Sequence, residues 1–146
     1  LDLEAERALQ ALLVALADAR LIRSAHDCSD GGLAVTLAEC CFGTGGMGAD
    51  VSIDSVDVGR SPALNEAAAL FGESATRVIV SATAASLASV LELAASAAVP
   101  ARVIGRTGGD RIRIALAGRT TVDLPVQDAE AAWSTAIERH FARRVA

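Results

Sequence analysis

Segments with helical spacing of apolar residues alternate along this chain with short β-branched runs, and this order restricts the fold more than any other feature. The helical spacing predicts helices at residues 2–20, 31–42, 62–71, 84–99 and 127–144. The β-branched or alternating runs predict strands at residues 21–25, 49–54, 77–82, 101–106, 111–116 and 120–126. Several strands follow one another directly, and the TGGD sequence at 107–110 is typical of a hairpin turn. We therefore expect an α+β fold with a mixed, largely antiparallel β-sheet packed with α-helices.

Composition excludes several classes of partner. The net charge of −5 gives no general attraction to nucleic acid or to an anionic lipid surface. The longest apolar run, at 84–99, is interrupted by serines and Glu92 and is too short to span a bilayer. The three cysteines, Cys28, Cys40 and Cys41, form no disulfide or zinc pattern and are interpreted as small buried side chains. These features predict a cytoplasmic protein without nucleic-acid or membrane partners.

The stretch HDCSDGGLAVTLAECC at 26–41 places polar residues and two glycines between a predicted strand and a predicted helix. Ser29 or Asp30 could cap that helix, and Gly31 and Gly32 leave its first N–H groups open to a phosphate oxygen. Asp27 precedes the turn and has the chemistry of a Mg²⁺ ligand. From the local pattern alone, a capped helix with a structural aspartate is the simpler interpretation.

Two further stretches carry polar residues at strand ends. In LFGESATRVIVS at 70–81, Glu73, Ser74 and Arg77 could meet a ligand at a sheet edge, or they could form the turn after a helix C-cap. In GRTGGDRIRI at 105–114, the glycines could approach a ligand, but we favour a hairpin. His26 has no nucleophile and orienting group beside it, so a hydrogen-bonded structural role is favoured and no catalytic residue is predicted.

Taken together and in this order, SAHDCSDGGLAVTLAE, LFGESATRVIVS and VIGRTGGDRIRI resemble the C-terminal part of the phosphoribosylformylglycinamidine synthase family, the PurL subunit of purine biosynthesis. The likeness covers nearly the whole chain. It implies that residues 1–146 are a single C-terminal domain of a larger multidomain synthase, with the fold of the aminoimidazole ribonucleotide synthetase C-terminal domain.

That resemblance also implies an activity. Members of this family convert formylglycinamide ribonucleotide to formylglycinamidine ribonucleotide with ATP, Mg²⁺ and glutamine-derived ammonia. The implied partners are the N-terminal domains of the same synthase, a glutaminase subunit and a small accessory subunit. The family's catalytic histidine would lie outside this chain, so the fragment is expected to be inactive alone.

The resemblance assigns roles residue by residue. Asp27 matches a Mg²⁺-binding aspartate of the family's active copy, and Ala75 stands where that copy has a substrate-contacting glutamine. The missing glutamine points to the second, structural copy of the unit. The residues expected to line the inter-domain nucleotide and phosphate cleft are Asp27, Ser29, Asp30, Gly31, Gly32, Glu73, Ser74 and Arg77.

Two alternatives remain open. The chain could be the corresponding domain of a related ATP-dependent synthetase or kinase of the same superfamily. It could also be a non-catalytic interaction module that keeps the fold and uses its apolar surfaces for self-association.

Overall fold

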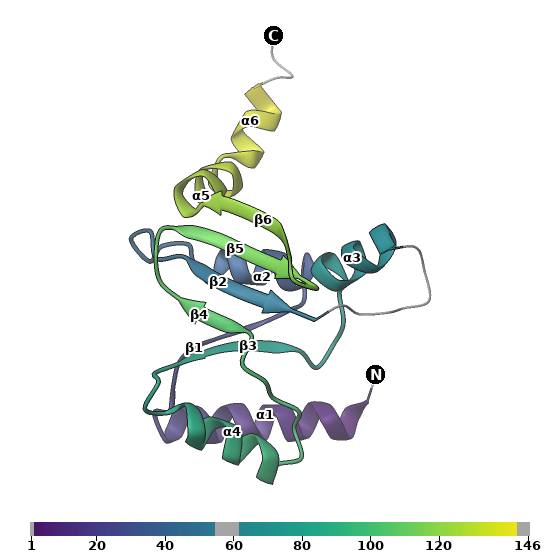
Figure 1. The fold of residues 1–146 in the computed structure, drawn as a ribbon, viewed down its shortest axis with the longest axis vertical. Helices are drawn as coiled ribbons and strands as arrows, with labels where there is room; N and C mark the ends of the chain where they lie inside the picture. The colour runs from purple at the N-terminus through teal and green to yellow at the C-terminus, as the bar shows by residue number, and fades with distance from the viewer. Residues whose placement is uncertain (1, 55–61, 143–146) are drawn as a thin grey trace. The chain divides into compact units, whose positions relative to one another are not determined.

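The computed structural model describes residues 2–54 and 62–142 and shows a mixture of helices and strands (Figure 1). The helices are α1 (Leu3–Asp18), α2 (Gly32–Glu39), α3 (Pro62–Phe71), α4 (Leu87–Ser96), α5 (Val126–Ser134) and α6 (Ala136–Ala142). The strands are β1 (Ile22–Asp27), β2 (Ala49–Ile53), β3 (Val78–Ala82), β4 (Gly105–Thr107), β5 (Arg111–Leu116) and β6 (Arg119–Pro125). The predicted α+β class is confirmed, although the strands form two sheets, one of two strands and one of four.

The chain forms two compact units, each built from two stretches of sequence. Unit 1 comprises Leu1–Thr36 and Ala67–Ile104, and unit 2 comprises Leu37–Glu66 and Gly105–Ala146. Unit 1 therefore holds α1, β1, β3 and α4, and unit 2 holds β2, β4, β5, β6, α5 and α6. The helices α2 and α3 each contribute residues to both units.

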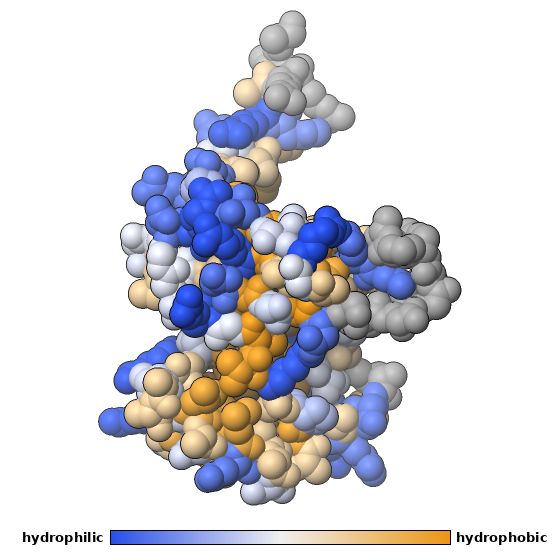
Figure 2. All heavy atoms as spheres, in the orientation of Figure 1, coloured by the Kyte–Doolittle hydropathy of each residue, from blue (hydrophilic) through white to orange (hydrophobic). Residues whose placement is uncertain are grey.

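In unit 1, α1 and α4 lie side by side and share an aliphatic core (Figure 1). The α1 helix begins at Asp2, whose Oδ1 accepts hydrogen bonds from the N–H groups of Glu4 and Ala5 at 3.0 and 3.1 Å. The buried members of the shared core are Leu12, Leu16, Val90 and Ala94. The outer surface over α4 is largely tan and orange in Figure 2, as expected for a helix rich in alanine.

The two-stranded sheet of unit 1 is antiparallel, with His26 opposite Ile79 and Asp27 opposite Val78. The pairing continues past β1, because the Cys28 N–H donates to the Arg77 carbonyl at 2.8 Å. In this register the end of β1 lies beside the start of β3.

The sheet of unit 2 has the strand order β4-β2-β5-β6. Strands β2 and β5 are parallel, and the other two pairs are antiparallel. Alternation along β2 and β5 buries one set of side chains, Ala49, Val51, Ile53, Ile112, Ile114 and Leu116. The opposite set is exposed or half-buried, and its members Asp50 and Arg113 are exposed.

The predicted hairpin at TGGD is wrong. Strands β4 and β5 do not pair with each other, because β2 lies between them and pairs with both. The loop crosses the start of β2, where Gly48 N–H donates to the Gly109 carbonyl at 2.9 Å and Gly108 N–H donates to the Gly48 carbonyl at 2.8 Å. A Cβ at Gly105 would lie 2.1 Å from the Asp50 carbonyl oxygen, so close strand pairing explains that glycine.

Helix ends also differ from the predicted ones. The α2 helix ends at Glu39, and α4 runs only from Leu87 to Ser96, because a turn precedes it and Ala98 adopts a left-handed conformation after it. The single predicted C-terminal helix is two helices that meet at Thr135. The Thr135 hydroxyl donates to the Ala131 carbonyl at 2.6 Å and competes with the helical bond from its own N–H, which stretches to 3.3 Å. Residues 143–144 of that prediction lie outside the described part of the chain.

All three cysteines are free thiols. Cys28 and Cys41 are buried and Cys40 is half-buried, which agrees with the packing role predicted for them. Burial raises the pKa of the Cys41 thiol, so that thiol stays protonated at neutral pH. Among the described helices, none combines the length and the apolar character needed to cross a membrane.

Candidate functional site

The site begins at Asp27, the last residue of β1. Its carboxylate is about two-thirds exposed (67%). A hydrogen bond from the Ser29 side chain holds the pKa of Asp27 below its ordinary value, with smaller help from its own backbone N–H and from nearby His26. His26 Nδ1 lies 2.8 Å from the Asp27 carbonyl oxygen, which fits the structural role predicted for that histidine. Asp27 thus presents an ionised carboxylate to solvent at neutral pH.

Two glycines in the left-handed conformation follow, Gly31 with φ +75° and Gly32 with φ +67°. The Gly31 N–H does not point to an open anion site, because Glu73 Oε1 accepts its hydrogen bond at 3.0 Å. A Cβ at Gly32 would lie 2.7 Å from the carbonyl carbon of Phe71, so the turn packs directly against the 71–73 backbone. The α2 helix begins at Gly32, and the N–H of the preceding Gly31 finds its partner in a carboxylate 42 residues away. The capping role of Ser29 or Asp30 stays a prediction.

Thr36 is a part of the site that the sequence reasoning missed. Its side chain is buried (1% exposed), and its hydroxyl lies 3.0 Å from the Asp27 carbonyl oxygen and 2.9 Å from the Gly32 carbonyl oxygen. The hydroxyl therefore ties the first turn of α2 to the end of β1. A threonine on the apolar face of a predicted helix was the available signal, because a buried hydroxyl needs a partner.

Arg77 holds the loop that carries Glu73 and Ser74. Its Nη2 donates to the Gly72 carbonyl at 2.9 Å, and its own carbonyl accepts from Cys28 N–H at 2.8 Å. Its Nε is buried and has no hydrogen-bond partner among the described residues. The guanidinium is thus directed into the loop, and its contacts are those of a positioning residue.

The structure brings Asp27, Ser29, Gly31, Gly32, Glu73 and Arg77 together within unit 1 through these contacts. Asp30 and Ser74 are exposed beside them, and within the described ranges no hydrogen bond or ion pair joins either side chain to the rest of the set. Three carboxylates and one engaged arginine give this turn an acidic character. Within residues 2–54 and 62–142, no group of three or more His, Cys, Asp or Glu side chains is arranged to hold a metal ion.

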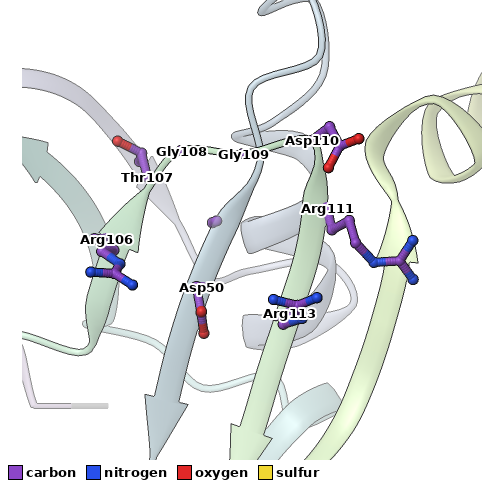
Figure 3. Close-up of a pocket in the computed structure, with 9 residues that line it drawn as sticks. Asp50, Arg106, Thr107, Gly108, Gly109, Asp110, Arg111 and Arg113 are labelled. Carbon is purple, nitrogen blue, oxygen red and sulfur yellow. The ribbon is translucent and has the colours of Figure 1, made fainter.

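A second feature lies on the exposed face of the unit 2 sheet, at the GRTGGDRIRI stretch where the sequence favours a hairpin over a ligand contact. An open hollow of about 270 Å³ is bounded by β2, β4, β5 and the TGGD loop (Figure 3). Its lining residues are Ala49, Asp50, Arg106, Thr107, Gly108, Gly109, Asp110, Arg111 and Arg113.

Strand register explains the charges on this face. Arg106, Asp50, Arg113 and Asp123 occupy one row across the four strands, so positive and negative side chains alternate. The Asp50 side chain lies between those of Arg106 and Arg113 in Figure 3. Asp123 accepts from Arg111 Nε at 2.5 Å and from Arg113 Nε at 3.2 Å, and the Arg111 bond is the main cause that lowers the pKa of Asp123. The row is close to charge balance and gives no strong preference for a phosphate.

The chain has an α+β fold, and within unit 1 a glycine-rich strand-to-helix turn is held by a distant carboxylate. The chain belongs to the family described as AIR synthase related protein, C-terminal domain, whose model matches residues 1–116. The match confirms the aminoimidazole ribonucleotide synthetase C-terminal fold that the sequence resemblance implied.

Curated relatives match almost the whole chain. The phosphoribosylformylglycinamidine synthase subunit PurL of Moorella thermoacetica is 38% identical over 143 residues, which is 98% of this chain and 18% of that protein. The subunit of the same name from Thermomicrobium roseum is 38% identical over 137 residues, 94% of this chain and again 18% of that protein. The chain therefore spans less than a fifth of the length of these relatives.

Solved structures share the fold. Thermotoga maritima PurL complexed with ATP matches with a TM-score of 0.73 and 23% identity, over 88% of this chain and 22% of that chain. The structure of PurLQS from the same organism matches with a TM-score of 0.72 and 24% identity, over 86% of this chain and 21% of that chain.

Proposed function

We propose that this chain is the C-terminal domain of a phosphoribosylformylglycinamidine synthase. In the longer protein, the reaction is the conversion of formylglycinamide ribonucleotide to formylglycinamidine ribonucleotide, with ATP and glutamine-derived ammonia. The observation that carries the proposal is the 38% identity to PurL subunits over 98% of the chain. We place all of residues 1–146 in this one domain and expect no turnover by the domain alone.

Within that enzyme, the turn of unit 1 would form one wall of a nucleotide and phosphate cleft. The residues assigned to the wall are Asp27, Ser29, Asp30, Gly31, Gly32, Glu73, Ser74 and Arg77. None of them is assigned a catalytic role, and Ala75 in place of a glutamine favours the structural copy of the site.

The negative charge of the carboxylates on this wall determines how a phosphate could bind there. Glu73 already accepts the Gly31 hydrogen bond, and Asp27 and Asp30 add two more negative groups. A phosphate approaching directly would meet repulsion, whereas Mg²⁺ binds one or two carboxylates together with phosphate oxygens. Asp27 fits this requirement, because its carboxylate is exposed and its pKa is lowered. When bound, the ion would screen the phosphate charge, and the remaining ligands would come from outside the described residues.

The longer protein would work with two other subunits. A glutaminase subunit would supply ammonia, a small accessory subunit would complete the complex, and the N-terminal domains of the same synthase would supply the opposite wall. The complex would work in the cytoplasm.

The proposal is tested on the full-length protein with its glutaminase partner. ATP- and glutamine-dependent formation of the amidine is expected from the complex and not from residues 1–146 alone. The variant Asp27→Asn should weaken Mg²⁺-dependent nucleotide binding at least tenfold, while Asp18→Asn, a matched exposed acid at the end of α1, should not. Turnover by the isolated chain, or equal binding by the two variants, would contradict the corresponding part of the proposal.

A second candidate is the equivalent domain of a related ATP-dependent synthetase or kinase. It is favoured only by the breadth of the family model, which describes AIR synthase related proteins in general. Phosphorylation or cyclisation of another substrate by the full-length protein, without amidine formation, would select it.

A further inference from the structure

The two C-terminal helices expose three large apolar side chains. Trp133 at the end of α5 and Ile137 and Phe141 on α6 are 58%, 74% and 61% exposed. The four-residue spacing places Ile137 and Phe141 on one face of α6, with Trp133 one turn before them. We call Trp133, Ile137 and Phe141 the C-terminal stripe.

Among the described residues of unit 2, a ring from another element contacts the first member of this stripe, whereas the Phe141 ring lies 5.7 Å from that of His140 on the same helix. The Phe42 ring lies 5.5 Å from the Trp133 ring, centroid to centroid, while α6 contains no buried residue. A helix of seven residues is far too short to be stable in water by its own hydrogen bonds. Within the described part of the chain, α6 contacts α5 but buries none of its own residues, so we infer that packing against a further surface stabilises it.

The exposed apolar area of the stripe distinguishes between the molecules that could cover it. With each aromatic side chain able to bury 150–250 Å², the exposed parts of the three residues amount to roughly 300–400 Å². A stable association of two separate molecules buries about 800 Å² on each partner, so the stripe alone cannot hold a second copy. A domain of the same polypeptide needs less area, because tethering gives it a high effective concentration.

The curated relatives are long enough to contain further domains. The alignment to the Moorella thermoacetica subunit covers 98% of this chain, yet the chain spans 18% of that protein. We propose that the C-terminal stripe docks into an apolar groove on another domain of the same longer polypeptide. Arg139 and His140 lie in the last turn of α6, so acidic side chains at the rim of the groove would complement them. The identity of the longer polypeptide rests on the proposed function, whereas the docking itself does not require that reaction.

The test compares full-length protein variants by amide hydrogen exchange of residues 136–142. Ile137→Glu places a charge in the docked face, and exchange in α6 should become at least tenfold faster than in the unmodified protein. Phe141→Gln is a second variant that should act in the same direction with a milder change. Val14→Glu is the control, because Val14 is 61% exposed on α1 and outside the stripe, and it should leave α6 exchange unchanged.

Other outcomes overturn the proposal. Exchange in α6 that is equally fast in the unmodified protein and both stripe variants means that no domain covers the stripe. A concentration-dependent dimer that is lost in Ile137→Glu means that a second copy is the occupant. An open reading frame no longer than this chain leaves no domain to dock. Amidine formation is assayed separately, so a failed activity with intact protection of α6 counts against the proposed function alone.

Discussion

Replacing Gly32 by alanine tests the central geometric claim about the site. Gly32 has a φ of +67°, and an added Cβ would lie 2.7 Å from the carbonyl carbon of Phe71, 2.9 Å from its Cα and 3.0 Å from the Gly72 oxygen. All three atoms belong to the backbone, so no side-chain rotation can relieve the contact. The turn or the 71–73 segment must move instead.

Two unfavourable contributions to the stability of the folded state add in the Gly32→Ala variant. An alanine in the left-handed conformation costs about 1–2 kcal/mol relative to an ordinary backbone conformation. Forcing an extra carbon into packed backbone costs about 1–3 kcal/mol more. We therefore expect Gly32→Ala to lower the free energy of unfolding by about 2–5 kcal/mol, a large part of the stability of an ordinary domain.

Gly43→Ala is the matched control for this prediction. Gly43 has a φ of +68°, nearly the same as Gly32, and an added Cβ would meet nothing within 4 Å. It should pay only the conformational cost of about 1–2 kcal/mol. Urea unfolding followed by far-ultraviolet circular dichroism measures both variants against the unmodified chain, and the Gly32→Ala midpoint should lie about 1 M below the Gly43→Ala midpoint.

The close approach of Gly32 to the Phe71 and Gly72 backbone is contradicted if the two variants differ by less than about 0.5 kcal/mol in their free energies of unfolding, the usual range of neutral surface changes. Equal midpoints would mean that the 71–73 backbone does not pack on the glycine turn. The Glu73 contact to Gly31, which depends on the same approach, would then also be in doubt.

Three further predictions concern single contacts. Thr36→Val keeps the shape of the side chain but removes its hydroxyl, and it should lower the free energy of unfolding in urea by about 1–3 kcal/mol, because the hydroxyl is buried. Arg111→Gln removes the hydrogen bond that mainly lowers the pKa of Asp123, so carboxyl NMR titration should show that pKa rise toward its ordinary value. Because the folded-state pKa of Asp123 is depressed, its stabilising contribution is present above the unfolded-state pKa and is lost as the pH falls through the folded-state value. Gly105→Ala should weaken the pairing of β4 with β2, and faster exchange of the amides in 105–107 would show it, whereas unchanged exchange would contradict the 2.1 Å approach to the Asp50 oxygen.

Elements with a clear local pattern could be predicted from sequence. The spacing of Leu9, Leu12 and Leu16 predicts α1, and these leucines are its buried residues. The alternation in 49–54 predicts β2, whose burial alternates strictly along the strand. Both cases depend on side chains that repeat with the period of one element, so the information lies within that element.

The TGGD stretch shows why register was harder. Two glycines and an aspartate predict a reversal of chain direction, and the chain does reverse there. A reversal between neighbouring strands needs a span of about 4.8 Å, and a reversal across an intervening strand needs about twice that, which a few extended residues can reach. Strand β2 lies between β4 and β5 and pairs with both, so they cannot form a hairpin. Because β2 lies some 55 residues earlier in the sequence, the turn residues alone do not reveal this pairing.

The candidate site depends in the same way on contacts between distant parts of the sequence. Asp27, Gly31 and Gly32 are recognisable in the sequence, but the bond from Gly31 to Glu73 joins residues 42 positions apart. That bond weakens the local argument for a phosphate cradle, since it occupies one of the N–H groups that the glycine pattern leaves open. Because the filling group is itself an anion, we propose that a cation such as Mg²⁺ would bridge this turn and a phosphate. A short motif can therefore identify the family while the partners of its N–H groups depend on a segment 42 residues away.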